Sequence, residues 1–331
     1  MSRADGLVVQ KYGGTSISNP DKVIAVAERV KRRLATVKRL VVVVSAMGDS
    51  TDELVALAQK VSRQPRGREM DLLLASGEQV AVSTLSLALQ DRGVDAISLT
   101  AAQCGIRTDG VFNLARIRSI DTRRIVGELD AGRVVIITGF QGITVSDEIT
   151  TLGRGGSDVT GAAVAAALGA SVCEICTDVA GVLSADPRLV VGARKWSEIS
   201  YEEAIELASS GAKVLHPRAA EICMSYEIPI HVRSSFTDES GTWIRSGGSI
   251  MEQAEVVGVT SDKEIAKITL LNVADRPGTA AQLFEELAEK QIGIRLIIQS
   301  ASSESRARIT FIVDEQFVDG AVEVVEKWKT S

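Results

Sequence analysis

Short continuous apolar runs alternate with longer amphipathic segments along most of this chain. The apolar runs lie at residues 6–14 (GLVVQKYGG), 39–48 (RLVVVVSAMG), 132–142 (GRVVIITGFQG) and 170–181 (ASVCEICTDVAG). Residues 21–34 (DKVIAVAERVKRRL) show the period of an amphipathic helix. Buried strands separated by helices are typical of a mainly parallel sheet that is covered on both faces. The pattern therefore predicts an α/β domain.

The loops that follow these runs predict where a ligand binds. In an open parallel sheet, ligands gather at the carboxyl ends of the strands. The loops 11–16 (KYGGTS), 45–51 (SAMGDST), 139–142 (GFQG) and 177–181 (TDVAG) should therefore face one crevice.

A glycine-rich loop with an arginine, TTLGRGGSDVT at residues 150–160, precedes a run of small residues. We predict a helix over residues 157–170, with Ser157 or Asp158 as its cap and Gly169 at its end. Free N–H groups and the helix dipole attract an anion, and the guanidinium of Arg154 can bind a carboxylate through two bonds. The alternative is a tight turn that carries a surface arginine.

Charged residues that suit a polyphosphate lie on other predicted loops. Lys11 precedes a glycine pair whose amides can surround a phosphate, although the GxxxxGKT pattern is absent and such a turn is often only a turn. Ser200 to Glu203 fits a capping box, so the helix after it should lead into GAKVLHP at residues 211–217. Each charge alone also fits a solvated loop.

Composition restricts the class of protein. The 331 residues exceed the roughly 250–300 at which a single core stops growing, so we expect a large and a smaller domain. A net charge of −6 argues against a general nucleic-acid binder. The apolar runs are short and the start MSRADG lacks the core of a signal peptide, which predicts a cytoplasmic protein without a membrane partner.

Cysteines and histidines are too few and too scattered for an obvious metal site. The pair Cys173 and Cys176 has Cys-x-x-Cys spacing, but it lies in an apolar run without a second pair, so we favour core residues over zinc or redox chemistry. His216 and His231 are interpreted as structural, with catalysis as the alternative.

The ordered series KYGGTS, VVVVSAMGDSTDEL, LLLASGEQ, GFQG, TTLGRGGSD, TDVAGVLSADPR, GAKVLHPRA and VRSSF resembles the aspartate kinases (aspartokinases) of the amino-acid kinase family. The resemblance implies a three-layer sandwich around a mainly parallel sheet, here as a catalytic domain at residues 1–245. It also implies transfer of the γ-phosphoryl group of ATP, with Mg2+, to the side-chain carboxylate of L-aspartate. Such a carboxylate has a pKa of about 3.9 and needs no general base, which agrees with the small number of histidines.

The resemblance also implies site residues. It assigns catalysis to Lys11, Asp158 and Lys213, and no protein ligand to a metal. It places around the nucleotide Lys11, Gly13, Gly14, Ser16, Thr177, Asp178, Leu183, Asp186, Arg188 and Lys213. It places around the amino acid and the transferred phosphate Ser45, Thr51, Glu78, Phe140, Arg154, Gly155, Gly156 and Ser157. Arg154 should bind a substrate carboxylate and Glu78 the ammonium, while Asp158 either orients Lys11 or caps the helix.

The last part of the chain predicts a second, smaller α+β domain. Residues 265–300 and 306–328 have the order strand, helix, strand, strand, helix, and DRPG precedes the first helix. This resembles an ACT domain, a regulatory βαββαβ module, at residues 254–331 after a boundary near 242–253. Residues 254–331 have room for one such unit without its final strand, so we expect a single, incomplete ACT-like domain, and Ser300 stands where the family commonly has asparagine. We therefore expect weak or absent inhibition by lysine or threonine, and a homodimer through the ACT region.

Two other functions stay open at this stage. The same chemistry can act on another small carboxylic acid, because a fold does not determine its substrate. The chain can also be a non-catalytic ACT-bearing subunit that binds amino acids or regulates a partner. The presence of Lys11, Glu78, Arg154 and Asp158 favours an active kinase.

Overall fold

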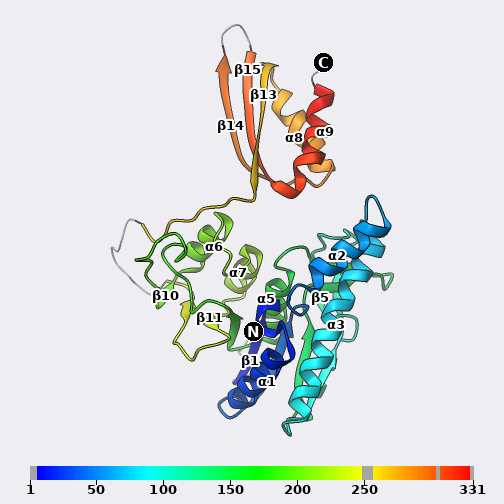
Figure 1. The fold of residues 1–331 in the computed structure, drawn as a ribbon, viewed down its shortest axis with the longest axis vertical. Coiled ribbons are helices and arrows are strands. Elements are labelled where there is room, and N and C mark those ends of the chain that lie inside the picture. Colours follow the sequence, from blue (N-terminus) through cyan, green and yellow to red (C-terminus); the bar gives the residue numbers. More distant parts are fainter. Residues whose placement is uncertain (1–5, 248–255, 303–305, 329–331) are drawn as a thin grey trace. The chain divides into compact units, whose positions relative to one another are not determined.

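A computed structural model describes residues 6–247, 256–302 and 306–328 of the chain. The chain divides into two compact units, Met1–Thr260 and Ser261–Ser331 (Figure 1). The domain ranges 1–245 and 254–331 stay a prediction, and residues 248–253 of the expected boundary lie outside the described residues.

The first unit is built on an eight-stranded sheet with the order β10-β12-β11-β9-β1-β2-β6-β3. Its strands are β1 Leu7–Tyr12, β2 Arg39–Val44, β3 Ala96–Leu99, β6 Val134–Thr138, β9 Val172–Thr177, β10 Glu198–Ile199, β11 Ile230–Ser234 and β12 Thr242–Ile244. The six strands from β11 to β3 pair in parallel, and β12 runs antiparallel to β11. The predicted mainly parallel sheet is confirmed.

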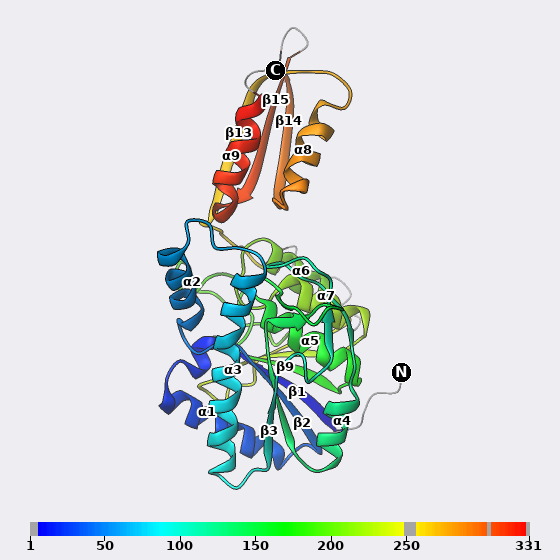
Figure 2. The same ribbon diagram turned by 90° about the vertical axis from the view of Figure 1, so that its right-hand side faces the viewer.

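Helices cover both faces of this sheet (Figure 2). One face carries α1 Pro20–Leu34 and α3 Arg68–Gln90. The other carries α4 Arg123–Asp130, α5 Gly156–Leu168, α6 Tyr201–Ser209 and α7 Pro217–Ser225. Helix α2 Ser50–Val61 packs on α3. The three predicted layers are therefore present.

Alternation along the strands explains the two cores. In β2, Val41 and Val43 point into the core under α5, while Val42 and Val44 point into the core under α1 and α3. All four side chains are buried. Because each buried valine contributes about 1.5–3 kcal/mol relative to an exposed one, a run of valines is stable only in a strand covered on both faces.

A smaller sheet lies beside the main one. It consists of β4 Ile106–Thr108, β5 Ile117–Ile120, β7 Gln141–Ile143 and β8 Ile149–Thr151, in the order β5-β4-β7-β8. Strand β7 begins at Gln141, within the GFQG segment, and β8 leads into the loop before α5. The hairpin thus connects two of the segments that were expected to bind ligand.

Helix α3 is long and apolar enough to span a membrane by length and composition, and among the described residues it is the one helix that is. Half of its most apolar window is buried in the protein. Asp71 of this helix is fully buried and accepts hydrogen bonds from Asn113 N (2.9 Å), Thr151 N (2.8 Å) and Thr151 Oγ1 (2.7 Å). These buried polar contacts are those of a core helix, which the short apolar runs of the sequence did not predict.

The second unit contains β13 Ile265–Ala274, α8 Thr279–Glu289, β14 Ile294–Ser302, β15 Arg306–Asp314 and α9 Val318–Lys327. Its strands form an antiparallel sheet in the order β13-β15-β14. Leu283 and Leu287 of α8 pack with Phe311 of β15 and Val324 of α9 in its core. Gly278, with φ +93°, turns the chain into α8 as the DRPG sequence predicted. The predicted order of elements is confirmed.

Candidate active site

The carboxyl ends of β1, β2 and β6 carry three loops that are hydrogen bonded to one another. Gly48 N donates to Gly14 O (3.0 Å), and Gly139 N donates to Val44 O (2.9 Å). A Cβ atom at Gly14 would lie 2.7 Å from Ala46 O, so the first two loops approach too closely for a side chain there. The loops KYGGTS, SAMGDST and GFQG therefore lie side by side at one edge of the sheet.

A buried ion pair occupies the centre of this edge. Lys11 Nζ of β1 lies 2.6 Å from Asp158 Oδ1 of α5, and the two side chains are 12% and 10% exposed. A Cβ at Gly13 would lie 3.4 Å from Lys11 Nζ, so the ammonium lies beside the turn at Gly13 and Gly14, called here the glycine turn. Gly161 of α5 packs on the Lys11 side chain, where an added Cβ would come within 3.2 Å of Lys11 Cβ. A small residue at this position lets the helix lie close to the strand.

The predicted cap of α5 is wrong. The N-cap residue is Gly155, with φ +70° and no side-chain capping bond, so neither Ser157 nor Asp158 caps the helix. The Asp158 carboxylate instead pairs with Lys11 and accepts a hydrogen bond from His216 N (3.1 Å). Of the two alternatives for Asp158, the structure has the contact with Lys11. The predicted end of the helix at Gly169, with φ +61°, is confirmed.

The ring of His216 packs against Gly155 in the loop before α5. A Cβ at Gly155 would collide with the His216 ring, so only glycine fits both the space and the positive φ. His216 Nδ1 accepts a hydrogen bond from Arg218 N (3.2 Å) and begins α7. Burial lowers the pKa of His216, which favours the neutral ring that this acceptor role requires.

Arg154 is the exposed residue of the same loop. Among the described residues its guanidinium has no ion-pair partner, unlike the paired Lys11 nearby. An arginine held on a loop beside a helix start and left without a carboxylate is available to bind one from a ligand.

Glu78 of α3 is the buried acid of the site. Glu78 is 2% exposed, and its Oε1 accepts a hydrogen bond from Ala46 N (3.2 Å). Oε2 is buried, and none of the described residues forms a hydrogen bond with it. Burial raises the pKa of Glu78 to about 7. A cationic ligand group beside Oε2 would satisfy this oxygen and favour the ionised carboxylate.

Phe140 and Ser157 pack against glycines between the loops. An added Cβ at Gly156 would lie 3.0 Å from the Phe140 ring, and one at Gly139 would lie 2.6 Å from Ser157 Oγ. Ser45 donates its backbone N–H to Tyr12 O (3.2 Å), and Thr51 lies in the first turn of α2.

A second group of predicted residues lies at the ends of β1 and β9. Ser16 Oγ and Ser235 Oγ are 2.6 Å apart, and Ser235 N donates to Thr177 O (2.7 Å). Thr177 Oγ1 donates to Asp178 Oδ1 (3.1 Å). Ser235 therefore links Thr177 to Ser16, which follows the turn at Gly13 and Gly14.

The remaining predicted residues lie on neighbouring segments. Asp186 and Arg188 form an ion pair (2.8 Å) in the segment after β9, where Leu183 bridges to Lys195. Lys213 is exposed between α6 and α7, three residues before His216. The capping box of Ser200 and Glu203 begins α6 as predicted, so the position of the segment after it is confirmed.

Two contact residues of the site were missed by sequence reasoning. His216 was interpreted as structural, with catalysis as the alternative, but its backbone contact with Asp158, which spans 58 residues of sequence, was not predicted. Ser235 lies in the VRSSF segment, for which the sequence predicted no role. The signal for Ser235 was its place at the end of a buried strand, where the other site residues also lie.

The cysteines are core residues, as expected. Cys104, Cys173, Cys176 and Cys223 are all free and buried. Burial raises the pKa of the Cys176 thiol to about 12, so the thiolate needed for redox or metal chemistry is disfavoured.

A cavity of ≈ 330 Å³ lies between the turn after β3, strands β4 and β5 and the start of α4. Its charged lining residues are already paired: Arg107 with Asp147 (2.7 Å), Arg124 with Glu128 (2.6 Å) and Asp121 with Arg123 (2.5 Å). The charges at the strand ends, which include an unpaired guanidinium and a buried acid, suit a ligand better.

Comparison with known proteins agrees with this geometry. Residues 6–234 match the amino acid kinase family, and residues 271–327 match an ACT domain family. The chain belongs to the amino acid kinase family. It is 47% identical to Aspartokinase 2 of Bacillus subtilis over 324 residues, which are 98% of this chain and 79% of that protein.

Solved aspartate kinases share the fold. The chain is similar to aspartate kinase from Synechocystis, with a TM-score of 0.66 and 46% identity, over 96% of this chain and 54% of that chain. It thus spans about half of the Synechocystis chain. It is also similar to E. coli aspartokinase III in complex with aspartate and ADP, with a TM-score of 0.77 and 28% identity, over 93% and 78% of the two chains.

Proposed function

We propose that this protein is an aspartate kinase, which transfers the γ-phosphoryl group of ATP to the side-chain carboxylate of L-aspartate. The products are 4-phospho-L-aspartate and ADP. The similarity to aspartokinases over nearly the whole chain supports this activity. The observation that carries it is the arrangement at one sheet edge of Lys11 beside a glycine turn and Glu78 with an unpaired oxygen. The first suits a phosphoryl group and the second suits an amino acid.

The chemistry requires two anions to approach each other. Lys11 would neutralise the transferring phosphoryl group, with Lys213 on the other phosphates, and this is where most of the rate acceleration of such a transfer arises. Asp158 would hold the Lys11 ammonium in place before the nucleotide binds. The attacking carboxylate is already ionised at neutral pH, so the protein needs only to bind and align it.

The amino acid would be bound through its two charged ends. Arg154 would contact a carboxylate and Glu78 the ammonium, because a zwitterion requires one partner of each sign. The lining of this part of the site would come from Ser45, Thr51, Phe140, Gly155, Gly156 and Ser157.

The nucleotide would lie across the ends of β1 and β9. Its proposed contacts are Gly13, Gly14, Ser16, Thr177, Asp178, Leu183, Asp186 and Arg188, with the two lysines. Mg2+ would arrive as the MgATP substrate. Such an ion usually keeps phosphate oxygens and water as ligands.

We also propose the setting in which the enzyme acts. The enzyme would act in the cytoplasm, and its product, aspartyl phosphate, would be used in lysine and threonine biosynthesis. The β14 edge of the second unit exposes Leu296, Ile297 and Ile298, which would suit a homodimer through the ACT region.

An acceptor comparison tests the proposed activity. ADP release with MgATP is measured with L-aspartate and, in parallel, with other small carboxylic acids at equal concentration. We expect L-aspartate to give the highest kcat/KM. A higher value for a different acid would assign another acceptor, and binding of amino acids without any ADP release would assign a non-catalytic subunit.

The activity should depend on pH through Glu78. The folded-state pKa of about 7 lies above the usual value, so the free carboxyl is protonated below pH 7 and must lose this proton to bind an ammonium. We expect kcat/KM for aspartate to rise about tenfold per pH unit up to about pH 7 and then to level off.

Glu78→Gln is the control for this profile. It should bind aspartate weakly at every pH and lose the rise between pH 5 and 7. A variant profile that still rises in parallel with the wild type would assign the titration to another group.

Feedback inhibition is expected to be weak. Ser300 lies on the exposed part of β14, where the family commonly has asparagine. In steady-state assays, lysine or threonine at millimolar concentration should lower the rate by less than about twofold. Strong inhibition by either amino acid would contradict this expectation, and Ser300→Asn would then show whether this position contributes.

A further inference from the structure

The VRSSF segment at the end of β11 lies against two parts of the proposed nucleotide site. Ser235 is 2% exposed, and its hydroxyl is 2.6 Å from the hydroxyl of Ser16, which is fully buried. Its backbone N–H donates to Thr177 O (2.7 Å). One buried residue therefore joins the glycine turn after β1 to the end of β9.

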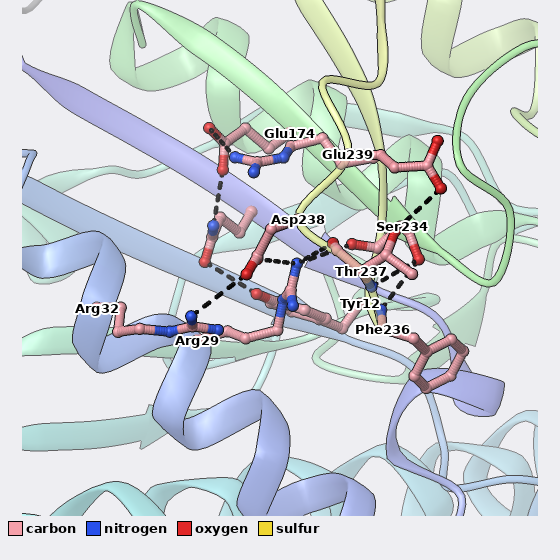
Figure 3. Close-up of polar contacts among 11 residues, drawn as sticks. Tyr12, Arg29, Arg32, Glu174, Ser234, Phe236, Thr237, Asp238 and Glu239 are labelled. Atoms are coloured by element: carbon pink, nitrogen blue, oxygen red, sulfur yellow. Dashed lines mark hydrogen bonds and ion pairs between the residues drawn. The ribbon is translucent and has the colours of Figure 1, made fainter. Parts of the chain in front are cut away.

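Helix α1 holds this segment from the other side. Figure 3 shows Arg29 extending from α1 toward the loop at residues 234–238. Arg29 donates to Ser234 O (3.2 Å) and Thr237 O (2.5 Å), and it pairs with Asp238 (3.1 Å). Ser234 Oγ accepts from the N–H groups of Phe236 (3.0 Å) and Thr237 (3.2 Å), which closes the turn. The loop is thus tied both to itself and to the helix.

A second contact joins the same loop to the glycine turn. Lys22 of α1 lies with Nζ 5.1 Å from the centre of the Phe236 ring and donates to Thr15 O (3.0 Å). Thr15 is the neighbour of Ser16, so the loop at residues 234–238 and the glycine turn share a lysine as well as a hydroxyl pair.

A largely buried carboxylate, that of Glu174, links α1 to strands β1, β9 and β11. Glu174 of β9, 1% exposed, pairs with Arg33 of α1 (2.6 Å) and accepts from Gln10 of β1 (2.7 Å). Arg233 of β11 lies 3.8 Å from the same carboxylate. Because separating a buried ion pair is costly, α1, β1, β9 and β11 should keep their relative positions when a ligand binds.

We propose that Ser235 is a positioning residue for the nucleotide, with Arg29 fixing the loop behind it. The Ser235 hydroxyl sets the orientation of the Ser16 hydroxyl, and its N–H holds Thr177 at the matching distance. Ser235 itself contacts protein atoms, so its effect reaches the nucleotide through Ser16 and Thr177. This inference rests on the proposed function, which assigns these two residues to the nucleotide.

The test is Ser235→Ala, which removes one oxygen. The affinity for ADP, measured by calorimetry, and KM for ATP should worsen about tenfold, the factor of one lost hydrogen bond. KM for aspartate should change by less than twofold. Ser225→Ala is the matched control, because it removes an exposed hydroxyl of α7 that, within the described part of the chain, donates only to Glu221 O (2.8 Å).

A double-mutant cycle shows whether Ser235 acts through Ser16. Ser16→Ala combined with Ser235→Ala should be no worse in ADP affinity than Ser16→Ala alone. The proposal is overturned if the losses of ADP affinity in the two single variants multiply in the double variant. It is also overturned by an unchanged ADP affinity in Ser235→Ala, or by equal increases of KM for ATP and KM for aspartate in that variant. If Ser235→Ala does not fold, Arg29→Lys keeps the charge near Asp238 and should give a smaller loss of the same kind.

ADP binding needs no acceptor. Loss of ADP affinity in Ser235→Ala therefore supports the inference even if the wild type fails to phosphorylate aspartate. Conversely, an active wild type with unchanged ADP affinity in the variant removes the inference and leaves the proposed function intact.

Discussion

Replacing Lys11 with alanine is expected to lower kcat about 10²–10³-fold, with little change in KM for aspartate. Lys11 is the cation at the glycine turn, held 2.6 Å from Asp158, and removing one preorganised donor from a developing charge costs a factor of this size. Steady-state kinetics in both substrates checks this. A loss confined to KM for aspartate would place Lys11 on the amino acid instead.

The ion pair requires a control for stability. Alanine at position 11 leaves the largely buried Asp158 carboxylate without its partner, which typically costs about 3–5 kcal/mol. Adding Asp158→Asn removes the unpaired charge, so the double variant should regain much of the thermal stability. Its kcat should stay low, because the phosphoryl group still lacks Lys11. Recovery of kcat together with stability would mean that the first loss came only from unfolding.

Replacing Arg154 with alanine is expected to raise KM for aspartate about 10–100-fold, with a smaller effect on kcat and on KM for ATP. A charged hydrogen-bonded contact contributes about 1.5–3 kcal/mol, and Arg154 has no ion-pair partner of its own among the described residues. Because the side chain is exposed, thermal stability should stay within about 0.5 kcal/mol of the wild type.

Arg154→Lys is the matched variant, since it keeps the charge but loses the two-pronged geometry. It should recover part of the aspartate affinity. Equal changes in kcat and KM for the Lys11 and Arg154 variants would contradict the division of roles between phosphoryl group and amino acid.

The features predicted from sequence are those that depend on neighbouring residues. The valines of β2 require burial on both faces, which a helix-covered parallel sheet supplies. The capping box at Ser200 and the end of α5 at Gly169 depend on a few residues each. The glycines near Lys11 mark places where loops from different strands come together.

The features that sequence did not predict depend on distant contacts. Asp158 has the residue type of a cap, but it is the third residue of α5, and its carboxylate contacts Lys11 and the backbone of His216, 58 residues away. Ser235 meets Ser16 across 219 residues of sequence. The buried Asp71 likewise depends on Asn113 and Thr151, which stabilise α3 as a core helix. Such pairings depend on the topology of the sheet, which local patterns do not specify.

Hydroxylamine trapping of the product tests the central claim most directly. The purified protein is incubated with MgATP, L-aspartate and hydroxylamine, and the hydroxamate is identified and counted against ADP. An aspartate kinase should form the side-chain hydroxamate of aspartate in a one-to-one ratio with ADP. Release of ADP without this hydroxamate, or a hydroxamate on the α-carboxylate, would contradict transfer to the side chain.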